Sequence, residues 1–179
     1  MEQIRIVDES DLSPEEDAAI RHGLCLAFPK DAHVFSQTRA WHGSGPSFSA
    51  LLESDGAILA HVGVVDRTVR VGDLSFRAAG VQNVYSLPNA RGRGLAKKAL
   101  ACAMGAAAER GYDIGLLFCV PELEAYYAGD GWRFAPVEGV VRLEDGRPLP
   151  LPKDNIAMFL PFRLDGIPSG VLHLCGNDW

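Results

Sequence analysis

The segment Val81–Ala96, VQNVYSLPNARGRGLA, contains a strand, a turn and a glycine-rich loop in close succession. Val81–Tyr85 alternates along its length and carries β-branched residues, which is typical of a strand. A Pro-Asn pair then breaks the strand, and Arg91–Ala96 opens an alanine-rich helical pattern. The first turn of a helix presents unpaired N–H groups and the positive end of the helix dipole. This segment therefore predicts a phosphate or pyrophosphate site, which the two arginines of the loop favour further.

The flanking segments predict a sheet whose first strands follow one another as a meander. An Asp-Gly pair between Phe48–Glu53 and Ala57–Val71 indicates a β-hairpin. Ile114–Val120 is continuously apolar and is predicted as a buried strand parallel to the central one. The residues between 31 and 46 are interpreted as a loop or short helix, forming either a surface connection, which we favour, or a substrate rim. The other expected strands are Ile4–Val7, Leu74–Arg77, Val140–Leu143, Ile156–Pro161 and Val171–Leu174, and the expected helices run from Ser13 to about Phe28, over Leu95–Arg110 and over Glu122–Ala128.

Length and composition indicate a single globular domain spanning residues 1–179. A net charge of -6 gives no general affinity for nucleic acid, so the basic loop is a local feature. The polar N-terminus and the lack of any membrane-length apolar run predict a cytoplasmic protein without membrane contact. The 4 scattered cysteines are expected to be free thiols, and the 5 histidines lack metal-ligand spacing, so no metal site is expected.

The loop pattern is Arg91-x-x-Gly94-x-Ala96, which fits neither a Walker loop nor the GxGxxG dinucleotide fingerprint. It resembles the acetyl-CoA-binding motif of the GNAT superfamily of N-acetyltransferases, whose signature is [Gln/Arg]-x-x-Gly-x-[Gly/Ala]. The context supports this resemblance: four strands precede the loop, and the string YYAGDGW over Tyr126–Trp132 matches the family's tyrosine motif on a short helix. The resemblance covers most of the chain.

The resemblance implies an α+β fold with a central, mixed, largely antiparallel twisted sheet of about six to eight strands, flanked by helices and splayed between its central strands. It implies acetyl-CoA as the cofactor, with pantetheine pairing with strand backbone in the splay and pyrophosphate on the amides of the loop. An open sheet offers unpaired backbone groups that an amide-bearing chain can satisfy, so the physics agrees. The cofactor-binding residues implied in this way are Val84, Tyr85, Ser86, Arg91, Gly92, Arg93, Gly94, Leu95, Ala96 and Cys119.

Two residues are assigned to catalysis by the same resemblance. Tyr127 matches the tyrosine that protonates the leaving thiolate, although sequence alone favours a packing role for it. Gln82 stands where the family usually has a carboxylate that acts as a base through water. An amide cannot act as a base, but it can hold a water or orient a substrate. The base is therefore another group, with Asp31, Asp154, Asp178 and the C-terminal carboxylate as candidates, or else the amine arrives neutral.

Within the superfamily, the chain resembles most the aminoglycoside 2′-N-acetyltransferases. The matching stretches are Ile58-Leu59-Ala60-His61, Trp41, Lys153-Asp154-Asn155 before Met158-Phe159-Leu160-Pro161, and Gly176-Asn177-Asp178-Trp179. The resemblance implies a small-molecule amine substrate, an aminoglycoside, and a homodimer. The implied substrate-binding residues are Asp31, Trp41, Gln82, Asp154, Asn177, Asp178 and Trp179; a docking role of the Trp179 ring on the core is the alternative for that residue.

Gln82 and Asn177 are amides where the resemblance implies carboxylates, which suggests a substrate with few positive charges, such as kasugamycin. Two further readings stay open. One is an acyltransferase acting on another small amine, because the run from His61 to the loop also resembles the rhizobial nodulation N-acyltransferases. The other is a non-catalytic acetyl-CoA sensor, which the missing base favours and the intact Tyr127 opposes.

Overall fold

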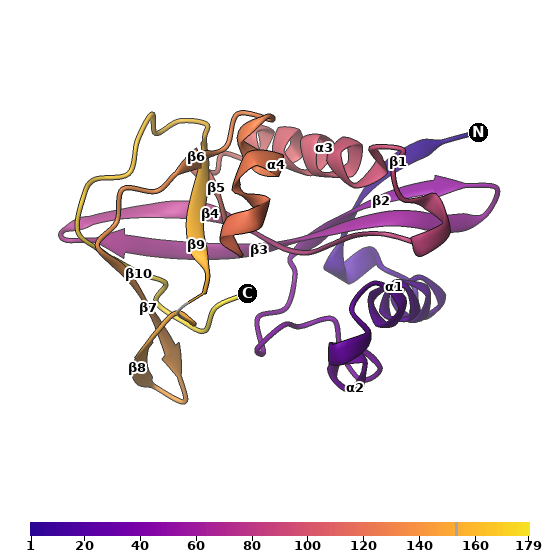
Figure 1. The fold of residues 1–179 in the computed structure, drawn as a ribbon, viewed down its shortest axis with the longest axis horizontal. Helices are drawn as coiled ribbons and strands as arrows, with labels where there is room; N and C mark the ends of the chain where they lie inside the picture. Colours follow the sequence, from indigo (N-terminus) through magenta and orange to yellow (C-terminus); the bar gives the residue numbers. More distant parts are fainter. Residues whose placement is uncertain (153) are drawn as a thin grey trace. The chain divides into compact units, whose positions relative to one another are not determined.

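The structure is a computed structural model that describes residues 1–152 and 154–179; Lys153 of the stretch Lys153-Asp154-Asn155 lies outside the described residues. The chain forms two compact units. The first unit comprises residues 1–41, 45–65 and 82–106, and the second comprises residues 42–44, 66–81 and 107–179. Figure 1 labels two long strands, β3 (Ala57–Val71) and β4 (Leu74–Ser86), and the helix α3 (Leu95–Glu109). Each of these three elements has residues in both units.

The other strands are β1 (Gln3–Asp8), β2 (Phe48–Ser54), β5 (Ile114–Cys119), β6 (Arg133–Phe134), β7 (Gly139–Glu144), β8 (Arg147–Pro150), β9 (Ile156–Pro161) and β10 (Val171–His173). The other α-helices are α1 (Pro14–Ala27), α2 (Ala32–Phe35) and α4 (Glu124–Ala128). Hydrogen-bonded neighbours follow the order β6-β9-β5-β4-β3-β10-β7-β8, and β2 pairs with both β1 and β3. The sheet is mixed, because β4–β5 and β10–β7 are parallel whereas β1–β2, β2–β3 and β5–β9 are antiparallel.

In the first unit, α1 begins as the sequence predicts. The Ser13 side chain accepts a hydrogen bond from the Glu16 backbone N–H, and the Glu16 carboxylate accepts one from the Ser13 N–H, which is a capping box. Pro14 occupies the first helical position, where its missing N–H has no intrahelical partner to lose. The helix ends with Phe28 as its C-cap, close to the predicted end.

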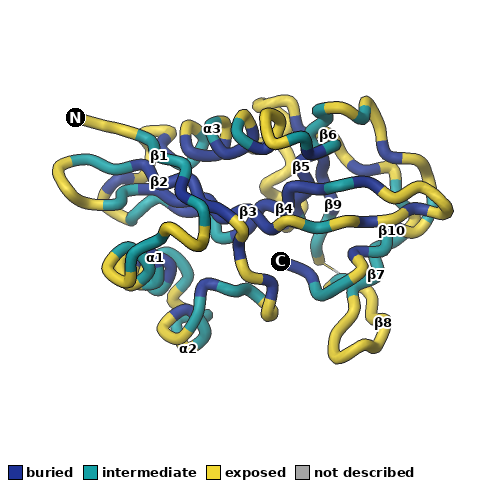
Figure 2. Tube along the Cα trace, turned by 180° about the vertical axis from the view of Figure 1, so that it is seen from behind, coloured by how far each residue is buried: buried dark blue, intermediate teal, exposed yellow. Residues whose placement is uncertain are grey.

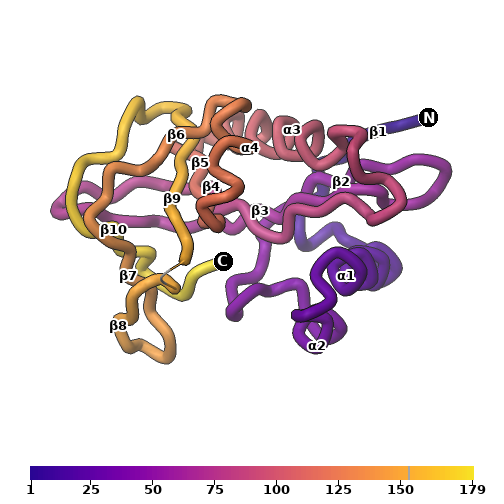
Figure 3. Tube along the Cα trace, viewed as in Figure 1, coloured from indigo at the N-terminus to yellow at the C-terminus, as the bar shows by residue number. Residues whose placement is uncertain are grey.

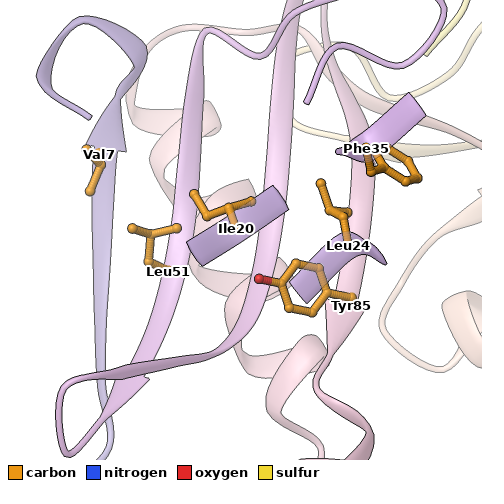
Figure 4. Packing of buried hydrophobic residues seen from close by; sticks show 6 residues of the cluster. All are labelled: Val7, Ile20, Leu24, Phe35, Leu51 and Tyr85. Atoms are coloured by element: carbon orange, nitrogen blue, oxygen red, sulfur yellow. The ribbon is translucent and has the colours of Figure 1, made fainter. Parts of the chain in front are cut away.

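Apolar side chains from α1, α2 and three strands form the core of the first unit (Figure 4). The buried members are Val7, Ile20, Leu24, Phe35, Leu51 and Tyr85. Gly23 allows the closest approach, because a Cβ built there would lie 2.3 Å from the Tyr85 hydroxyl. The phenol of β4 therefore packs directly against the backbone of α1.

The last residues of α3 belong to the second unit and lead into β5, which is parallel to β4 as predicted. The β4–β5 ladder pairs Ala78 with Ile114, Ala79 with Gly115 and Gly80 with Leu116. β5 then continues to Cys119 beside β9. Figure 3 follows the chain from β10 to its last residue, where Leu174 and Gly176 hydrogen-bond to the backbone of β7. The tip of the β7–β8 hairpin is exposed (Figure 2).

Several details differ from the patterns read in the sequence. Leu74–Arg77 and Val81–Tyr85 belong to one continuous strand, β4, rather than to two segments. β8 lies within residues 144–154, where only turns were expected. The helix expected over Glu122–Ala128 is divided into a 3-10 turn, Pro121–Leu123, and α4. The structure contains no described helix that is long and apolar enough to cross a membrane.

Candidate functional site

The glycine-rich loop is an exposed turn at the start of α3 in the first unit. Gly92 and Gly94 both have left-handed backbone, with φ values of 75° and 71°, which glycine adopts without a steric penalty. A Cβ built on either glycine would meet no atom within 4 Å. Arg93 is held by Glu2, with 2.6 Å between Nη2 and Oε1, and Lys98 bonds the other Glu2 oxygen at 3.0 Å. The open glycine backbone and the helix N-terminus fit an anionic ligand.

β4 contains one residue with unusual backbone, Asn83, directly after Gln82. Asn83 has left-handed backbone with φ 56°, a region that asparagine tolerates better than most residues. Its side-chain Nδ2 donates a 2.6 Å hydrogen bond to the Arg39 carbonyl. The residues that follow Asn83 are Val84–Ser86, the segment predicted to pair with pantetheine.

His61 of β3 contacts the backbone of Asn83. Its Nδ1 lies 2.9 Å from the Asn83 carbonyl oxygen, and its Nε2 lies 3.1 Å from the Ser49 hydroxyl. The ring is fully buried and stacks on Tyr85 with 5.6 Å between centroids. Burial lowers the pKa of His61 to about 4, so the ring is neutral near pH 7. The neutral ring donates from Nδ1 to Asn83 and accepts from Ser49.

Arg39 anchors the same network and is itself almost fully buried. Its Nε donates to Asp17 Oδ1 at 2.6 Å, and its Nη2 donates to Glu9 Oε1. Burial by itself would lower the pKa of Arg39, but its hydrogen bonds to Glu9 and Asp17 outweigh burial and raise the pKa. The guanidinium is therefore a fixed cation, and the backbone carbonyl of the same residue accepts the hydrogen bond from Asn83.

Tyr127 lies on α4 in the second unit and is 7% exposed. Burial, with the nearby Cys119 thiol as a smaller cause, holds the pKa of Tyr127 well above its ordinary value, so the phenol keeps its proton. Its ring meets Trp132 edge-on at 6.1 Å. Cys119 is also buried, with Sγ 4.0 Å from the Met158 sulfur, and burial raises the pKa of its thiol to about 11. Both residues are proton-bearing groups near pH 7.

The segment Asn177–Trp179 is clamped to residues 42–44 within the second unit. The Asn177 amide donates to the His42 carbonyl at 2.7 Å and accepts from Arg142 Nη1 at 3.0 Å. The carboxylate of Asp178 is buried and meets His42 Nδ1 at 2.9 Å and Arg142 Nη1 at 3.4 Å. The polar atoms of Asn177 are thus engaged within the chain, which favours a positioning role for this residue.

The Trp179 ring occupies the end of the β4–β5 ladder. It is 5% exposed and lies 5.2 Å from the Phe118 ring of β5, measured between centroids. A Cβ built on Gly80 of β4 would approach ring atoms of Trp179 to 2.4 Å, so only glycine leaves room for the indole. Arg67 lies over the ring, with Cζ 5.5 Å from its centroid. The docking role that the sequence left open for this side chain is therefore confirmed for its ring.

The structure distributes the predicted site residues over the two units. The first unit holds Asp31, Trp41, Gln82, Val84, Tyr85, Ser86 and Arg91–Ala96. Within it, Gln82 is buried, and Trp41 stacks on Phe35 at 5.3 Å against the core. The second unit holds Cys119, Tyr127, Asp154, Asn177, Asp178 and Trp179, of which Asp154 is exposed. The catalytic and substrate-binding roles of all these residues stay predictions.

Sequence reasoning missed three residues of the second unit that hold Asn177–Trp179. They are His42, Arg67 and Arg142. His42 falls in the irregular stretch before β2 and the two arginines fall within strands, so no motif or spacing marks them. Their role follows only from the contacts.

Comparison with known proteins identifies the class to which this fold and loop belong. The acetyltransferase (GNAT) domain family matches residues 12–135. The chain is 30% identical over 169 residues to an aminoglycoside 2′-N-acetyltransferase of Mycolicibacterium fortuitum, covering 93% of this chain and 82% of that protein. It is 32% identical over 75 residues to the nodulation protein A of a Rhizobium strain, covering 42% of this chain and 36% of that protein.

Two solved structures show the same fold. The GNAT family N-acetyltransferase YhbS of Escherichia coli, in complex with CoA, has a TM-score of 0.69 at 17% identity, covering 97% of this chain and 89% of that one. A GNAT family acetyltransferase of Brucella melitensis, in complex with acetyl-CoA, has a TM-score of 0.63 at 20% identity, covering 95% and 94%.

The protein is an N-acetyltransferase. It belongs to the GNAT superfamily and uses acetyl-CoA. The open glycine backbone at the start of α3 fits the pyrophosphate of that cofactor. The mixed, helix-flanked sheet confirms the fold class that the sequence predicts.

Proposed function

We propose that this protein transfers the acetyl group of acetyl-CoA directly to the 2′-amino group of an aminoglycoside and thereby confers resistance. The observation that carries the proposal is the 30% identity to an aminoglycoside 2′-N-acetyltransferase, which extends over 93% of this chain. Cytoplasmic action, a homodimer and a single catalytic domain over residues 1–179 belong to the same proposal.

In this proposal, one set of residues binds the cofactor and Tyr127 takes part in the chemical step. The backbone N–H groups of Arg91–Ala96 hold the pyrophosphate, and the backbone of Val84–Ser86 pairs with the pantetheine amides. When bound, acetyl-CoA supplies an activated thioester. Tyr127 donates its phenolic proton to the departing sulfur as the acetyl carbon exchanges its bond to sulfur for a bond to nitrogen. The proton that the nitrogen then loses restores the phenol, so the exchange balances.

Kasugamycin is the acceptor that we favour. Gln82 and Asn177 carry no charge, and Asn177 is engaged by Arg142 and by the His42 carbonyl. Each amide attracts a polycationic drug less strongly than a carboxylate at the same position would. Kasugamycin has a 2′-amino group but few other positive charges, so amides in place of carboxylates weaken its binding little.

The test is a CoA-release assay over an acceptor panel of kasugamycin, tobramycin and kanamycin. We expect kasugamycin to have the highest kcat/KM, and mass spectrometry to find a single added acetyl group. Faster turnover of the polycationic drugs would exclude the kasugamycin preference but keep the aminoglycoside proposal. Turnover of none of the three would exclude both.

One observation favours a second candidate, transfer of a longer acyl chain. Apolar residues from β7, β8 and β9 line a cavity of about 390 Å³ in the second unit, with Val141, Pro150 and Ile156 among them. The partial match to nodulation protein A is consistent with this candidate. A series of acyl-CoA donors from two to sixteen carbons separates the two, because the first proposal expects kcat/KM to be highest for acetyl and to fall with chain length.

A further inference from the structure

The reaction needs a group that removes a proton from the acceptor, because an amino-sugar amine is largely an ammonium ion near pH 7. Gln82 cannot supply this function, since an amide does not accept a proton at neutral pH. A His–Asp pair in the second unit has the geometry of an oriented base. It joins His42 Nδ1 and Asp178 Oδ1 at 2.9 Å, although 136 residues separate the two in sequence.

The exposure of the two side chains fits a base and the group that orients it, because the base must be accessible and the orienting group can be buried. The Asp178 side chain is 5% exposed, whereas the His42 side chain is 36% exposed. A buried carboxylate that accepts from Nδ1–H fixes the tautomer with the lone pair on Nε2. The charged groups that surround the pair are Arg142 on β7, which contacts Asp178 at 3.4 Å, Glu144, which pairs with Arg142 at 3.1 Å, and Arg67 on β3.

The backbone holds His42 rigidly in this position. Its φ of 47° is left-handed, a conformation that non-glycine residues keep only where the surroundings enforce it. Here the Asn177 amide donates to the His42 carbonyl, and the Ser44 hydroxyl donates to the Asn177 carbonyl at 3.2 Å. Residues 42–44 and 177–178 thus hold each other at several points, and the imidazole is preorganised.

The pair adjoins the place where the β4–β5 ladder ends. Asp178 precedes Trp179, whose ring fills the space over Gly80 and packs on Phe118. The indole Nε1 is buried and has no hydrogen-bond acceptor among residues 1–152 and 154–179. A buried donor without an acceptor is costly, so this end of the ladder is not optimised for stability alone.

We propose that His42 is the general base of this acetyltransferase and that Asp178 is its positioning residue. The lone pair on His42 Nε2 takes one proton from the acceptor ammonium and leaves a neutral amine, whose own lone pair then forms the bond to the acetyl carbon. The imidazolium returns that proton to solvent. This inference rests on the proposed transfer to an amine. It assigns the general-base role, which Gln82 cannot fill, to His42, a residue that belongs to no sequence motif.

The first experiment compares His42→Asn with the wild type. Asparagine tolerates the left-handed backbone, and its amide can still donate to Asp178, so the substitution removes the base and keeps the contact. We expect kcat near pH 7 to fall about 100-fold, as the loss of a general base does, with acetyl-CoA affinity unchanged. The deficit should narrow as the pH rises through the pKa of the acceptor amine, since a neutral amine needs no base. His33→Asn, at an exposed histidine of α2, is the matched control.

The second experiment needs no turnover. Nitrogen-15 NMR of labelled histidine should show the Nδ1–H tautomer for His42 in the wild type and its loss in Asp178→Asn. A rate within about twofold of the wild type for His42→Asn, or a deficit that stays constant with pH, would overturn the proposal. A wild-type His42 with its proton on Nε2 would overturn it too. If no acceptor is acetylated at all, the proposed function fails, and the tautomer measurement alone decides the role of the pair.

Discussion

His61 Nδ1 lies 2.9 Å from the carbonyl oxygen of Asn83, so a neutral, buried ring of β3 holds the one left-handed residue of β4. The backbone after Asn83 is the segment proposed to pair with pantetheine. The conformation of the segment proposed to bind the cofactor therefore depends on the hydrogen bonds of His61 and Asn83 inside the first unit.

Asn83→Ala tests this network through stability. Alanine loses the hydrogen bond to the Arg39 carbonyl and places a Cβ in left-handed backbone, so we expect the free energy of unfolding to fall by about 2 to 4 kcal/mol. Asn83→Gly is the matched variant, because glycine loses only the hydrogen bond and should cost about 1 to 2 kcal/mol. Urea unfolding measures both. Equal losses for the two variants would show that backbone strain contributes nothing at this position.

His61 predicts how stability depends on pH. Its pKa is about 4 in the folded protein and about 6.5 in the unfolded chain, so the unfolded chain binds the proton more readily between these values. The contribution of His61 is complete above pH 6.5 and is lost as the pH falls towards 4, by about 3 kcal/mol in all. Urea midpoints at pH 7.5 and pH 5 should therefore differ more in the wild type than in His61→Gln. A pH dependence that the substitution leaves unchanged would contradict the assignment.

Tyr127→Phe tests the proton donor. The phenol is buried and keeps its proton, so its removal should lower kcat by about 100-fold while acetyl-CoA binding, measured by calorimetry, stays unchanged. Tyr126→Phe is the matched control, because Tyr126 is its neighbour on α4 and is 36% exposed. A sensor without catalysis would show no turnover in the wild type and no difference between the two variants.

Local patterns predicted much of the fold. Ser13, Pro14 and Glu16 determine the start of α1 by direct capping, and the Asp-Gly pair at residues 55 and 56 adopts left-handed backbone in the β2–β3 hairpin. The sequence pattern predicts two segments in place of β4, because Ala78-Ala79-Gly80 between them has little strand propensity. In the fold these residues are held by the parallel ladder with β5, so tertiary pairing overrides propensity.

The missed features depend on contacts between distant segments. β8 contains Pro148 and Pro150, which argue against a strand except at the edge of a sheet, and β8 is the last strand in the order. The His42–Asp178 pair has no periodicity and no spacing that a sequence pattern could reveal. The loop motif was found because its glycines and arginines act locally, whereas the pair exists only once the chain has folded.

Gly80→Ala tests the packing of the Trp179 ring against β4. Its backbone is outside the left-handed region, so alanine is disfavoured only by the indole, whose atoms lie 2.4 to 2.8 Å from the added Cβ. We expect the ring to be displaced, with a fall of about 1 to 3 kcal/mol in the free energy of unfolding from overpacking and a red shift of tryptophan emission. Activity should fall as well, because Asp178 and His42 are held through the same segment.

Gly105→Ala is the control for this prediction. Its Cβ meets no atom within 4 Å, and a better helix former in α3 should raise the free energy of unfolding by up to about 1 kcal/mol. Unchanged emission and stability in Gly80→Ala would mean that the indole does not occupy the end of the β4–β5 ladder.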